Sequence, residues 1–254
     1  MDENGLIIDL HNVSFTYPGR APILDQLTFS FYRGDRMGLM GPNGSGKTTL
    51  FHVIMGLLKP SSGKMEILGR PVQEEKDFRE VRQKIGLLFQ DADDQLFSPT
   101  VLEDVAFGPL NLGKSVDEAK AIALRTLESL GLGGFEERIT HKLSGGEKRL
   151  VSLATVLAME PDVLLLDEPT TGLDEATERR LVEILQSIDL SFIVVSHNID
   201  FLMKTTEFIS YMARGRISLD EESIPHTHVH VHKHGRYAHK HTHGGSDTHK
   251  KTDE

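Results

Sequence analysis

The sequence predicts an α/β fold with a parallel sheet at its centre, and three observations carry this prediction. A glycine-rich loop at residues 41–49 lies between a short apolar strand at 36–40 and a helix at 50–58. Residues 163–166 form an unbroken apolar run, which is typical of a central parallel strand. A second such strand is expected at residues 191–195. Helical segments separate these strands, and this alternation favours a parallel sheet covered by helices.

The segment before the loop is expected to form a small antiparallel sheet. Residues 6–13 alternate roughly between apolar and polar side chains, and residues 27–32 alternate clearly. Tyr17 lies in the turn after the first of these strands. Two roles fit Tyr17: it stacks on an adenine ring, or it is an ordinary core or turn aromatic. Its spacing alone favours the second role.

A helical insertion is expected between residues 91 and 160, because its segments have helical periodicity and no strand pattern. These segments are residues 101–110, 116–130 and 147–158. The remaining predicted elements are strands at 64–68 and 85–89, helices at 78–83 and 175–187, and closing edge strands at 208–212 and 216–219.

Composition limits the classes of function. A chain of 254 residues suffices for one α/β domain with a large core, and its net charge of −10 excludes a general nucleic-acid-binding surface. The absence of cysteine excludes disulfides and thiolate metal sites. No secretory signal and no apolar run of about 18 residues is found in the sequence. A soluble cytoplasmic protein is therefore expected, and any role at a membrane would come through a partner.

The loop at residues 41–49 matches the pattern G-x-x-x-x-G-K-[ST] through Gly41, Gly46, Lys47 and Thr48. The glycines let the backbone turn tightly and point its N–H groups at a phosphate. A helix that starts near Lys47 adds the positive end of its dipole. Lys47 is expected to reach the β- and γ-phosphates, and the Thr48 hydroxyl to ligate Mg²⁺. The sequence therefore predicts a nucleoside triphosphate site.

Two carboxylates end the apolar run, at the edge where α/β sheets bind their ligands. Asp167 suits holding Mg²⁺, directly or through water, and Glu168 suits polarising the water that attacks the γ-phosphorus. The pair could instead only cap the next helix. The phosphate loop upstream favours the functional interpretation.

Residues 143–147, Leu-Ser-Gly-Gly-Glu, precede another helix, and we call them the signature segment. Ser144 and Glu147 have the spacing of a capping box, as at ordinary helix starts. Gly145 and Gly146 add little to a cap, but they expose N–H groups to which an anion can bind. The chain thus has two helix N-termini that could bind a phosphate, but only one of them carries the phosphate-loop motif. A second copy, packed head-to-tail, would let each chain supply the half that the other lacks.

Taken in order, the phosphate loop, Gln90, the signature segment, the Leu-Leu-Leu-Asp-Glu run and His197 resemble the ATP-binding cassette (ABC) ATPases over residues 6 to about 217. The resemblance implies a P-loop NTPase fold, in which a RecA-like core sheet carries an N-terminal antiparallel β subdomain and an inserted helical subdomain. It implies ATP and Mg²⁺ as ligands. It also implies adenine stacking by Tyr17 and contact of Gln90 with Mg²⁺ or the attacking water.

The resemblance further assigns residue roles. Glu168 would be the catalytic base and His197 a switch that contacts the γ-phosphate, with Lys47 and Gln90 completing the catalytic set. Asp174 would lie on a loop that faces the second subunit. The implied nucleotide contacts are Tyr17, Gly41, Pro42, Asn43, Gly44, Ser45, Gly46, Lys47, Thr48, Thr49, Gln90, Asp167 and Asp174, with Ser144, Gly145 and Gly146 from the opposite subunit, and the implied Mg²⁺ ligands are Thr48, Gln90 and Asp167.

Residues 94–113 resemble the energy-coupling-factor and cobalt/nickel importer ATPases in particular. This resemblance implies a second ATPase subunit, identical or related, and integral membrane partners at the cytoplasmic face of the membrane. The chain departs from the family at Glu147, where Gln is usual, and at residues 91–94, which read Asp-Ala-Asp-Asp. The first departure puts a carboxylate near a phosphate site.

Nine of the thirteen histidines lie between His226 and His249, in a tail at 220–254 that is expected to be disordered beyond an ATPase domain at 1–219. Imidazole suits Ni²⁺, Co²⁺ and Zn²⁺, and the affinity order favours nickel over cobalt. A purification tag or a solvated, pH-sensitive tail are the alternatives. The candidate ligands are His226, His228, His230, His232, His234, His239, His241 and His243.

These features together predict the ATPase subunit of a nickel or cobalt importer. A vitamin importer of the energy-coupling-factor type, with an incidental tail, is the main alternative. A soluble ABC ATPase of DNA repair or translation is disfavoured, because the chain has neither a long coiled-coil insertion nor a second cassette. A plain metal-storage protein is disfavoured by the complete set of ATPase motifs.

Overall fold

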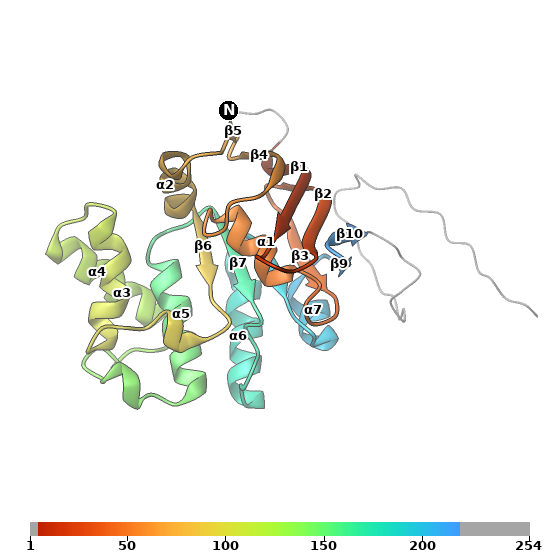
Figure 1. The fold of residues 1–254 in the computed structure, drawn as a ribbon. Helices are drawn as coiled ribbons and strands as arrows, with labels where there is room; N and C mark the ends of the chain where they lie inside the picture. Colours follow the sequence, from red (N-terminus) through yellow and green to blue (C-terminus); the bar gives the residue numbers. More distant parts are fainter. Residues whose placement is uncertain (1–4, 219–254) are drawn as a thin grey trace, which may run out of the picture. The chain divides into compact units, whose positions relative to one another are not determined.

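The computed structural model describes residues 5–218, which fall within one compact unit built from two sheets and the helices around them (Figure 1). The larger sheet has the strand order β10-β9-β3-β8-β7-β6, and the smaller has the order β2-β1-β4-β5. The larger sheet comprises β3 (Arg36–Met40), β6 (Ile85–Leu88), β7 (Val163–Asp167), β8 (Ser191–Val195), β9 (Phe208–Ala213) and β10 (Arg216–Ser218). The smaller comprises β1 (Leu6–Thr16), β2 (Pro22–Tyr32), β4 (Ser62–Ile67) and β5 (Arg70–Pro71).

The larger sheet is parallel except for its last strand, because only β10 pairs antiparallel, with β9. Its central strands are buried on both faces. Val163 and Leu165 of β7 pack in one apolar core, whereas Leu164 and Leu166 pack in another. This period of two explains why the run carries no polar residue: both of its faces lie in cores. The register pairs Asp167 with Val195, so the carboxyl ends of β7 and β8 meet at one edge.

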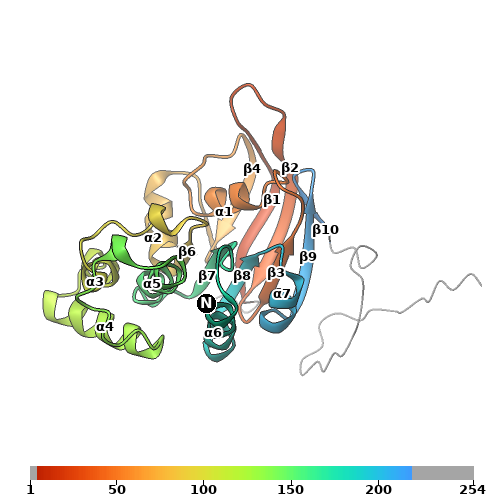
Figure 2. The ribbon, with the colours of Figure 1, turned by 90° about the horizontal axis from the view of Figure 1, so that it is seen from below.

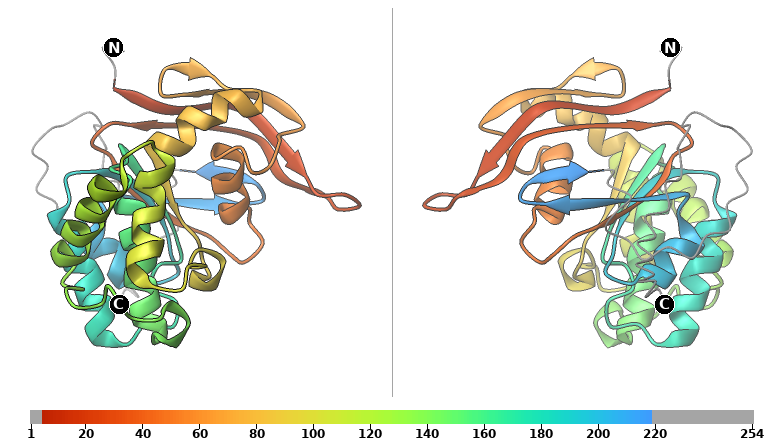
Figure 3. Two further views of the ribbon diagram at one scale, coloured as in Figure 1. Left: turned by 90° about the vertical axis from the view of Figure 1, so that its left-hand side faces the viewer. Right: turned by 90° about the vertical axis from the view of Figure 1, so that its right-hand side faces the viewer.

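The smaller sheet is antiparallel throughout and shares a core with the first helix, α1 (Lys47–Ile54). Figure 3 shows the long strands β1 and β2 lying across the larger sheet, with α1 on their inner side. This arrangement places the loop before α1 beside the end of β1.

Three helices between β6 and β7, α3 to α5, form a separate group at the β6 edge of the larger sheet (Figures 1 and 2). Helices α3 and α4 pack on each other and on α5, and α5 also contacts β6. The helices are α2 (Glu75–Lys84), α3 (Val101–Asn111), α4 (Val116–Ser129), α5 (Gly145–Leu157), α6 (Glu175–Ser187) and α7 (Ile199–Thr205), with short 3₁₀ turns η1 (Ala92–Asp94) and η2 (Thr140–Lys142). Among residues 5–218, no helix is long and apolar enough to cross a membrane.

The structure confirms the α/β class, the antiparallel sheet before the loop and the inserted helices, and it corrects three details. Helix α1 ends at Ile54 and not at Leu58, because Gly56 has a φ of 67° and brings the backbone against the ring of Phe78. Strand β9 is not an edge strand, since it lies between β3 and β10. Helix α7 was not expected from the sequence.

Candidate active site

The phosphate loop depends on glycine at positions where the chain passes close to other backbone. Gly41 has a φ of 151°, and a Cβ there would lie 2.1 Å from the carbonyl oxygen of Met212. Gly46 has a φ of 110°, and its Cβ would lie 2.8 Å from the carbonyl oxygen of Ile23. A larger residue at either position would push the loop away from β9 or β2. The fold therefore requires these glycines as well as the phosphate chemistry.

Lys47 opens α1 and is buried beneath the loop. Its Nζ donates to the carbonyl oxygens of Gly41, at 2.8 Å, and Pro42, at 3.1 Å. Burial lowers the pKa of Lys47, and the charges of Glu168 and Asp167 oppose that shift. The ammonium is thus held inside the ring of the loop, with acidic groups from the end of β7 facing it.

Asp167 is buried at the end of β7, and its Oδ1 has no hydrogen-bond partner among residues 5–218. Burial raises the pKa of Asp167, whereas the Thr48 hydroxyl and nearby cations lower it. A buried carboxylate oxygen without a donor is costly unless a cation reaches it. Asp167 and Thr48 are also the hard oxygen ligands that Mg²⁺ prefers beside phosphates. The residues present therefore fit a magnesium ion.

Glu168 follows Asp167 in a strained backbone conformation, with a φ of 45°. Its N–H donates to the carbonyl oxygen of Val195, at 2.9 Å, which fixes the turn at the strand end. Burial raises the pKa of the Glu168 carboxyl, and His197 lowers it. A raised pKa brings a carboxylate closer to the range in which it accepts a proton effectively at neutral pH.

His197 lies at the end of β8, on the same side as Glu168. Its Nε2 is 3.0 Å from Oδ1 of Asn43 and 3.3 Å from Oε1 of Glu168. The first contact is a hydrogen bond, whereas Oε1 of Glu168 has no hydrogen-bond partner in the described residues. His197 thus connects the phosphate loop to the carboxylate. The sequence places these three residues 154 positions apart at most, and the fold brings them together.

Gln90 follows β6 and lines a pocket of about 610 Å³ together with Thr48 and Asp167. The signature segment reaches the same pocket through Gly145. Arg149 of α5 is buried there, and its guanidinium donates to the carbonyl oxygens of Phe89, at 2.6 Å, and Gln90. Arg149 ties the helix after the signature segment to the backbone at Gln90.

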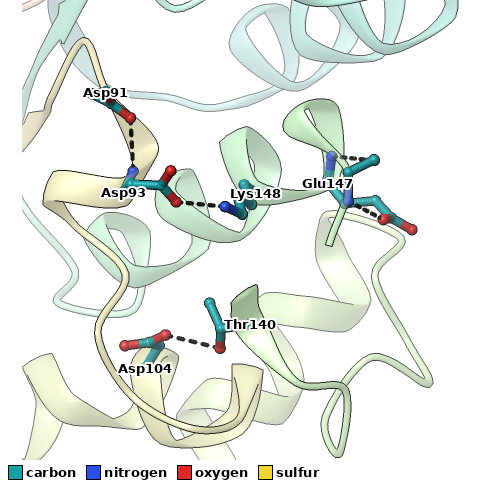
Figure 4. Close-up of polar contacts among 7 residues, drawn as sticks. Asp91, Asp93, Asp104, Thr140, Glu147 and Lys148 are labelled. Atoms are coloured by element: carbon teal, nitrogen blue, oxygen red, sulfur yellow. Dashed lines mark hydrogen bonds and ion pairs between the residues drawn. The ribbon is translucent and has the colours of Figure 1, made fainter. Parts of the chain in front are cut away.

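Sequence reasoning missed Arg149 and two further contacts of the same kind. Gln95 accepts from Phe89 N–H, at 3.2 Å, and donates to the carbonyl oxygen of Ser152, at 2.9 Å. Lys148 pairs with Asp93 at 2.5 Å (Figure 4). The contacts of Gln95 with Ser152 and of Lys148 with Asp93 join segments more than 50 residues apart, so no local pattern predicts these partners. The one signal in the sequence was the charged Arg149 in a helix segment that is otherwise mostly apolar and buried.

The signature segment forms the capping box that its spacing predicts. Ser144 Oγ accepts from Glu147 N–H at 3.3 Å, and Glu147 Oε2 accepts from Ser144 N–H at 2.8 Å. Gly145 is open, since a Cβ there would meet nothing within 4 Å. Gly146 also has a packing role, because its Cβ would lie 3.0 Å from Oγ1 of Thr177. Within residues 5–218, the signature segment makes no hydrogen bond to the phosphate loop.

The two remaining candidate residues lie at the margins. Tyr17 is half-buried, packs edge-on against Phe15 with ring centroids 4.8 Å apart, and has its hydroxyl 3.4 Å from Oγ1 of Thr49. Asp174 is exposed and caps α6 by accepting from Thr177 N–H at 2.9 Å. The structure thus gives each a structural role, and their nucleotide or dimer roles stay predictions.

The histidines at 226–243 lie outside the described residues. Within residues 5–218, no group of three or more histidine and acidic side chains could hold a metal ion. A magnesium ion at Asp167 would therefore depend on Thr48, Gln90 and the phosphates of the nucleotide for its other ligands.

A phosphate loop between a parallel strand and a helix, with acidic groups at the end of a neighbouring strand, defines a P-loop nucleoside triphosphatase. Residues 24–171 match the ABC transporter family. The energy-coupling factor transporter ATP-binding protein EcfA of Methanothermobacter thermautotrophicus is 42% identical over 215 residues, which cover 83% of this chain and 69% of the relative. The chain belongs to the ABC transporter family, and it is an ATP-binding ATPase whose hydrolysis is coupled to transport.

Solved structures support the same assignment. CbiO1 of Clostridium perfringens, a part of the transporter complex cbiONQ, has a TM-score of 0.75 and 35% identity, with 85% of this chain and 88% of that chain covered. A dimeric ATP-binding cassette bound to ADP and Pi has a TM-score of 0.76 and 29% identity, with 83% of this chain and 96% of that chain covered. The fold is therefore that of the ABC ATPases.

Proposed function

We propose that this chain is the ATPase subunit of an energy-coupling-factor type importer, working as a head-to-tail dimer at the cytoplasmic face of the membrane. The second subunit is another copy of this chain or a related ATPase, and integral membrane subunits carry the cargo. The observation that carries the proposal is the pairing of one complete phosphate loop with a second open anion-binding helix start. The two starts share no hydrogen bond within residues 5–218 of one chain. Dimeric relatives support this arrangement.

Each residue has a task in this proposal. The loop amides and Lys47 bind the phosphates, and release of Lys47 from the carbonyls of Gly41 and Pro42 frees its ammonium for them. Glu168 accepts a proton from the attacking water, and His197 holds the γ-phosphate while Asn43 orients its ring. Thr48, Asp167 and Gln90 would hold Mg²⁺, which neutralises phosphate charge when bound.

The opposite subunit supplies the signature segment. Gly145 offers an open surface at the start of α5, where free N–H groups and the helix dipole favour an anion. Arg149, Gln95 and Lys148 connect α5 to the segment around Gln90. A change at the nucleotide is thereby carried into the inserted helices. Exposed apolar side chains lie there too: Phe107 is in α3, and Phe97 is in the segment before α3.

ATP-dependent dimerisation tests this proposal. The Glu168→Gln variant is expected to bind ATP and form a stable dimer, because closure precedes hydrolysis. Sedimentation velocity with and without ATP measures the dimer, and Lys47→Ala added to this variant is the control that should abolish it. A variant that binds ATP and stays monomeric, alone and with its membrane partners, would contradict the proposal.

For the cargo, we propose a transition metal, nickel or cobalt, with nickel favoured. The support is the histidine-rich segment at 226–249, whose imidazoles suit these ions. A vitamin importer is the second candidate, because relatives named as energy-coupling factor transporter ATP-binding proteins cover 83% and 82% of this chain.

Uptake distinguishes the two cargoes. Cells that contain this chain with its membrane subunits are expected to accumulate Ni²⁺ or Co²⁺, and Lys47→Ala should abolish the accumulation. If Lys47→Ala abolishes vitamin uptake and leaves metal uptake unchanged, the vitamin importer is favoured. Deletion of residues 220–254 tests the tail: equal import at all metal levels would exclude a regulatory role for it.

A further inference from the structure

The start of α5 has a carboxylate where the proposed function needs a phosphate to bind. Glu147 lies in the first turn of this helix, and its Oε2 is bound by the N–H of Ser144. This hydrogen bond is the main reason why the pKa of Glu147 is lowered, and the side chain is therefore ionised at neutral pH. A negative charge at this place would repel the phosphates of a nucleotide that docks on the helix start.

The second carboxylate oxygen has a cationic partner from another part of the chain. Oε1 of Glu147 accepts from Nη1 of Arg138 at 2.8 Å. The guanidinium carbon of Arg138 lies 3.6 Å from the ring centroid of Phe135, and its main chain bonds to Phe135 and Val101. Stacking and backbone bonds thus hold the arginine in position before the carboxylate reaches it, which reduces the entropy that the ion pair costs.

The two cations that follow Glu147 are engaged elsewhere. Lys148 pairs with Asp93, and Arg149 donates to carbonyl oxygens at Phe89 and Gln90. In Figure 4, the Lys148 ammonium points toward Asp93, and the carboxylate of Glu147 points away from it. Neither side chain balances the charge of Glu147.

We propose that Arg138 is a positioning residue that neutralises Glu147 and so keeps the start of α5 competent to bind a phosphate of the partner's nucleotide. This inference rests on the proposed head-to-tail dimer. The pair keeps both groups of the capping box in place, while the positive charge offsets the carboxylate within the first turn. Arg138 would be unnecessary for this purpose if residue 147 were uncharged. The test therefore compares the effect of losing Arg138 in chains with Glu147 and in chains with an uncharged residue 147.

A double-mutant cycle tests the inference, with Glu168→Gln present in every chain so that ATP holds the dimer. Arg138→Met is expected to weaken the ATP-dependent dimer by about threefold to tenfold, as for loss of a charge at an interface. With Glu147→Gln also present, Arg138→Met should change the dimer dissociation constant by less than about twofold. The effect in the Glu147 background should shrink as salt rises from 0.1 M to 1 M, since the screening length falls from about 10 Å to about 3 Å.

Two controls separate this role from a structural one. Arg216→Met removes an exposed arginine paired with Asp25 at 2.9 Å, and it should leave the dimer unchanged. Arg138→Gln keeps a hydrogen-bond donor without the charge, and it gives the same comparison if the methionine variant does not fold. Thermal melting and ATP binding to the monomer should be alike in all variants.

Each outcome decides one point. Equal weakening by Arg138→Met with and without Glu147→Gln would overturn the inference, because Arg138 would then act directly on the partner or on the loop. No weakening at all would overturn it as well. If the Glu168→Gln parent itself forms no dimer with ATP, the proposed function fails, and the inference fails with it.

Discussion

Glu168 combines a strained backbone, a side chain only 14% exposed and a carboxylate oxygen without a hydrogen-bond partner in residues 5–218. Its φ of 45° costs roughly 1 kcal/mol or more for a residue with a Cβ, and such strain persists where the surroundings fix it. The hydrogen bond to Val195 and the contact with His197 supply that fixation. The result is a carboxylate with one oxygen, Oε1, that makes no hydrogen bond in the described part of the chain.

We predict that Glu168→Gln lowers ATP turnover by roughly 10²–10⁴, because an amide has no basic oxygen with which to accept a proton. The amide keeps the size of the side chain, so ATP binding should persist. Steady-state hydrolysis and binding of a fluorescent ATP analogue measure the two quantities. Unchanged turnover would show that another group is the base.

A second prediction concerns Asp167. The pKa of this buried carboxyl is raised, so its ionised form destabilises the fold at neutral pH. Asp167→Asn should therefore raise the free energy of unfolding at pH 7, without nucleotide or Mg²⁺. Stability of the parent is greatest below the ordinary pKa of 3.8 and falls as pH rises through the raised value, so the difference should vanish in acid.

Urea unfolding at several pH values measures this difference. A variant less stable than the parent at pH 7 would mean that Thr48 and the nearby cations more than compensate the burial of the charge. The same variant should hydrolyse ATP poorly, since it loses a proposed magnesium ligand.

Residues that act through a local pattern were predictable, and those that act over distance were not. The spacing around Lys47 predicted the loop, and Ser144 with Glu147 predicted the capping box that the structure has. Arg138 and Arg149 were missed, because their partners lie across turns or in another segment. Their side chains carry no signal until the inserted helices are assembled.

At the scale of elements, a buried carboxylate joins α3 to the turn before the signature segment. Asp104 is 3% exposed, and its Oδ1 accepts from the N–H groups of Phe97 and Ser98. Its Oδ2 accepts from Oγ1 of Thr140 at 3.1 Å (Figure 4). Backbone bonds from Val101 and Thr140 run beside this contact. These bonds therefore hold the segment at 97–104 against the turn before the signature segment.

Thr140→Val tests this connection. The change keeps the shape of the side chain but leaves Oδ2 of Asp104 without its donor, so the free energy of unfolding should fall by about 1–3 kcal/mol. Ser129→Ala is the matched control. The exposed hydroxyl of Ser129 donates to the carbonyl oxygen of Thr126 in its own helix, so its loss should change the free energy of unfolding by less than about 0.5 kcal/mol. Chemical denaturation measures both, and equal effects would contradict the account.

Whether a segment forms a helix or a strand was predictable where its apolar pattern repeats over enough residues. Which elements pack next to each other was not predictable. Helix α6 and strand β8 have the bounds that their patterns predicted, 175–187 and 191–195. Helix α7 has seven residues, too few for a clear period, and it was missed. The end of α1 was misplaced because the ring of Phe78, from another helix, fixes where the chain turns.

At the scale of the whole molecule, the phosphate loop precedes α1 and the signature segment lies at the start of α5. Both line one pocket, and within residues 5–218 no hydrogen bond joins them. The order of motifs along the chain does not predict this arrangement, since it depends on which sheet edge the inserted helices cover. The central claim is that the signature segment of a second copy completes the nucleotide site at the phosphate loop.

Mixing two inactive variants tests this claim most directly. Lys47→Ala disables the phosphate loop, and Gly145→Asp puts a carboxylate at the open helix start, where a Cβ meets nothing within 4 Å of its own chain. Each variant alone should be inactive, because both sites of its dimer are damaged. In an equal mixture, half of the dimers are mixed and each has one intact site, so activity should return to about a quarter of that of the parent. A mixture no more active than its components would contradict a shared site.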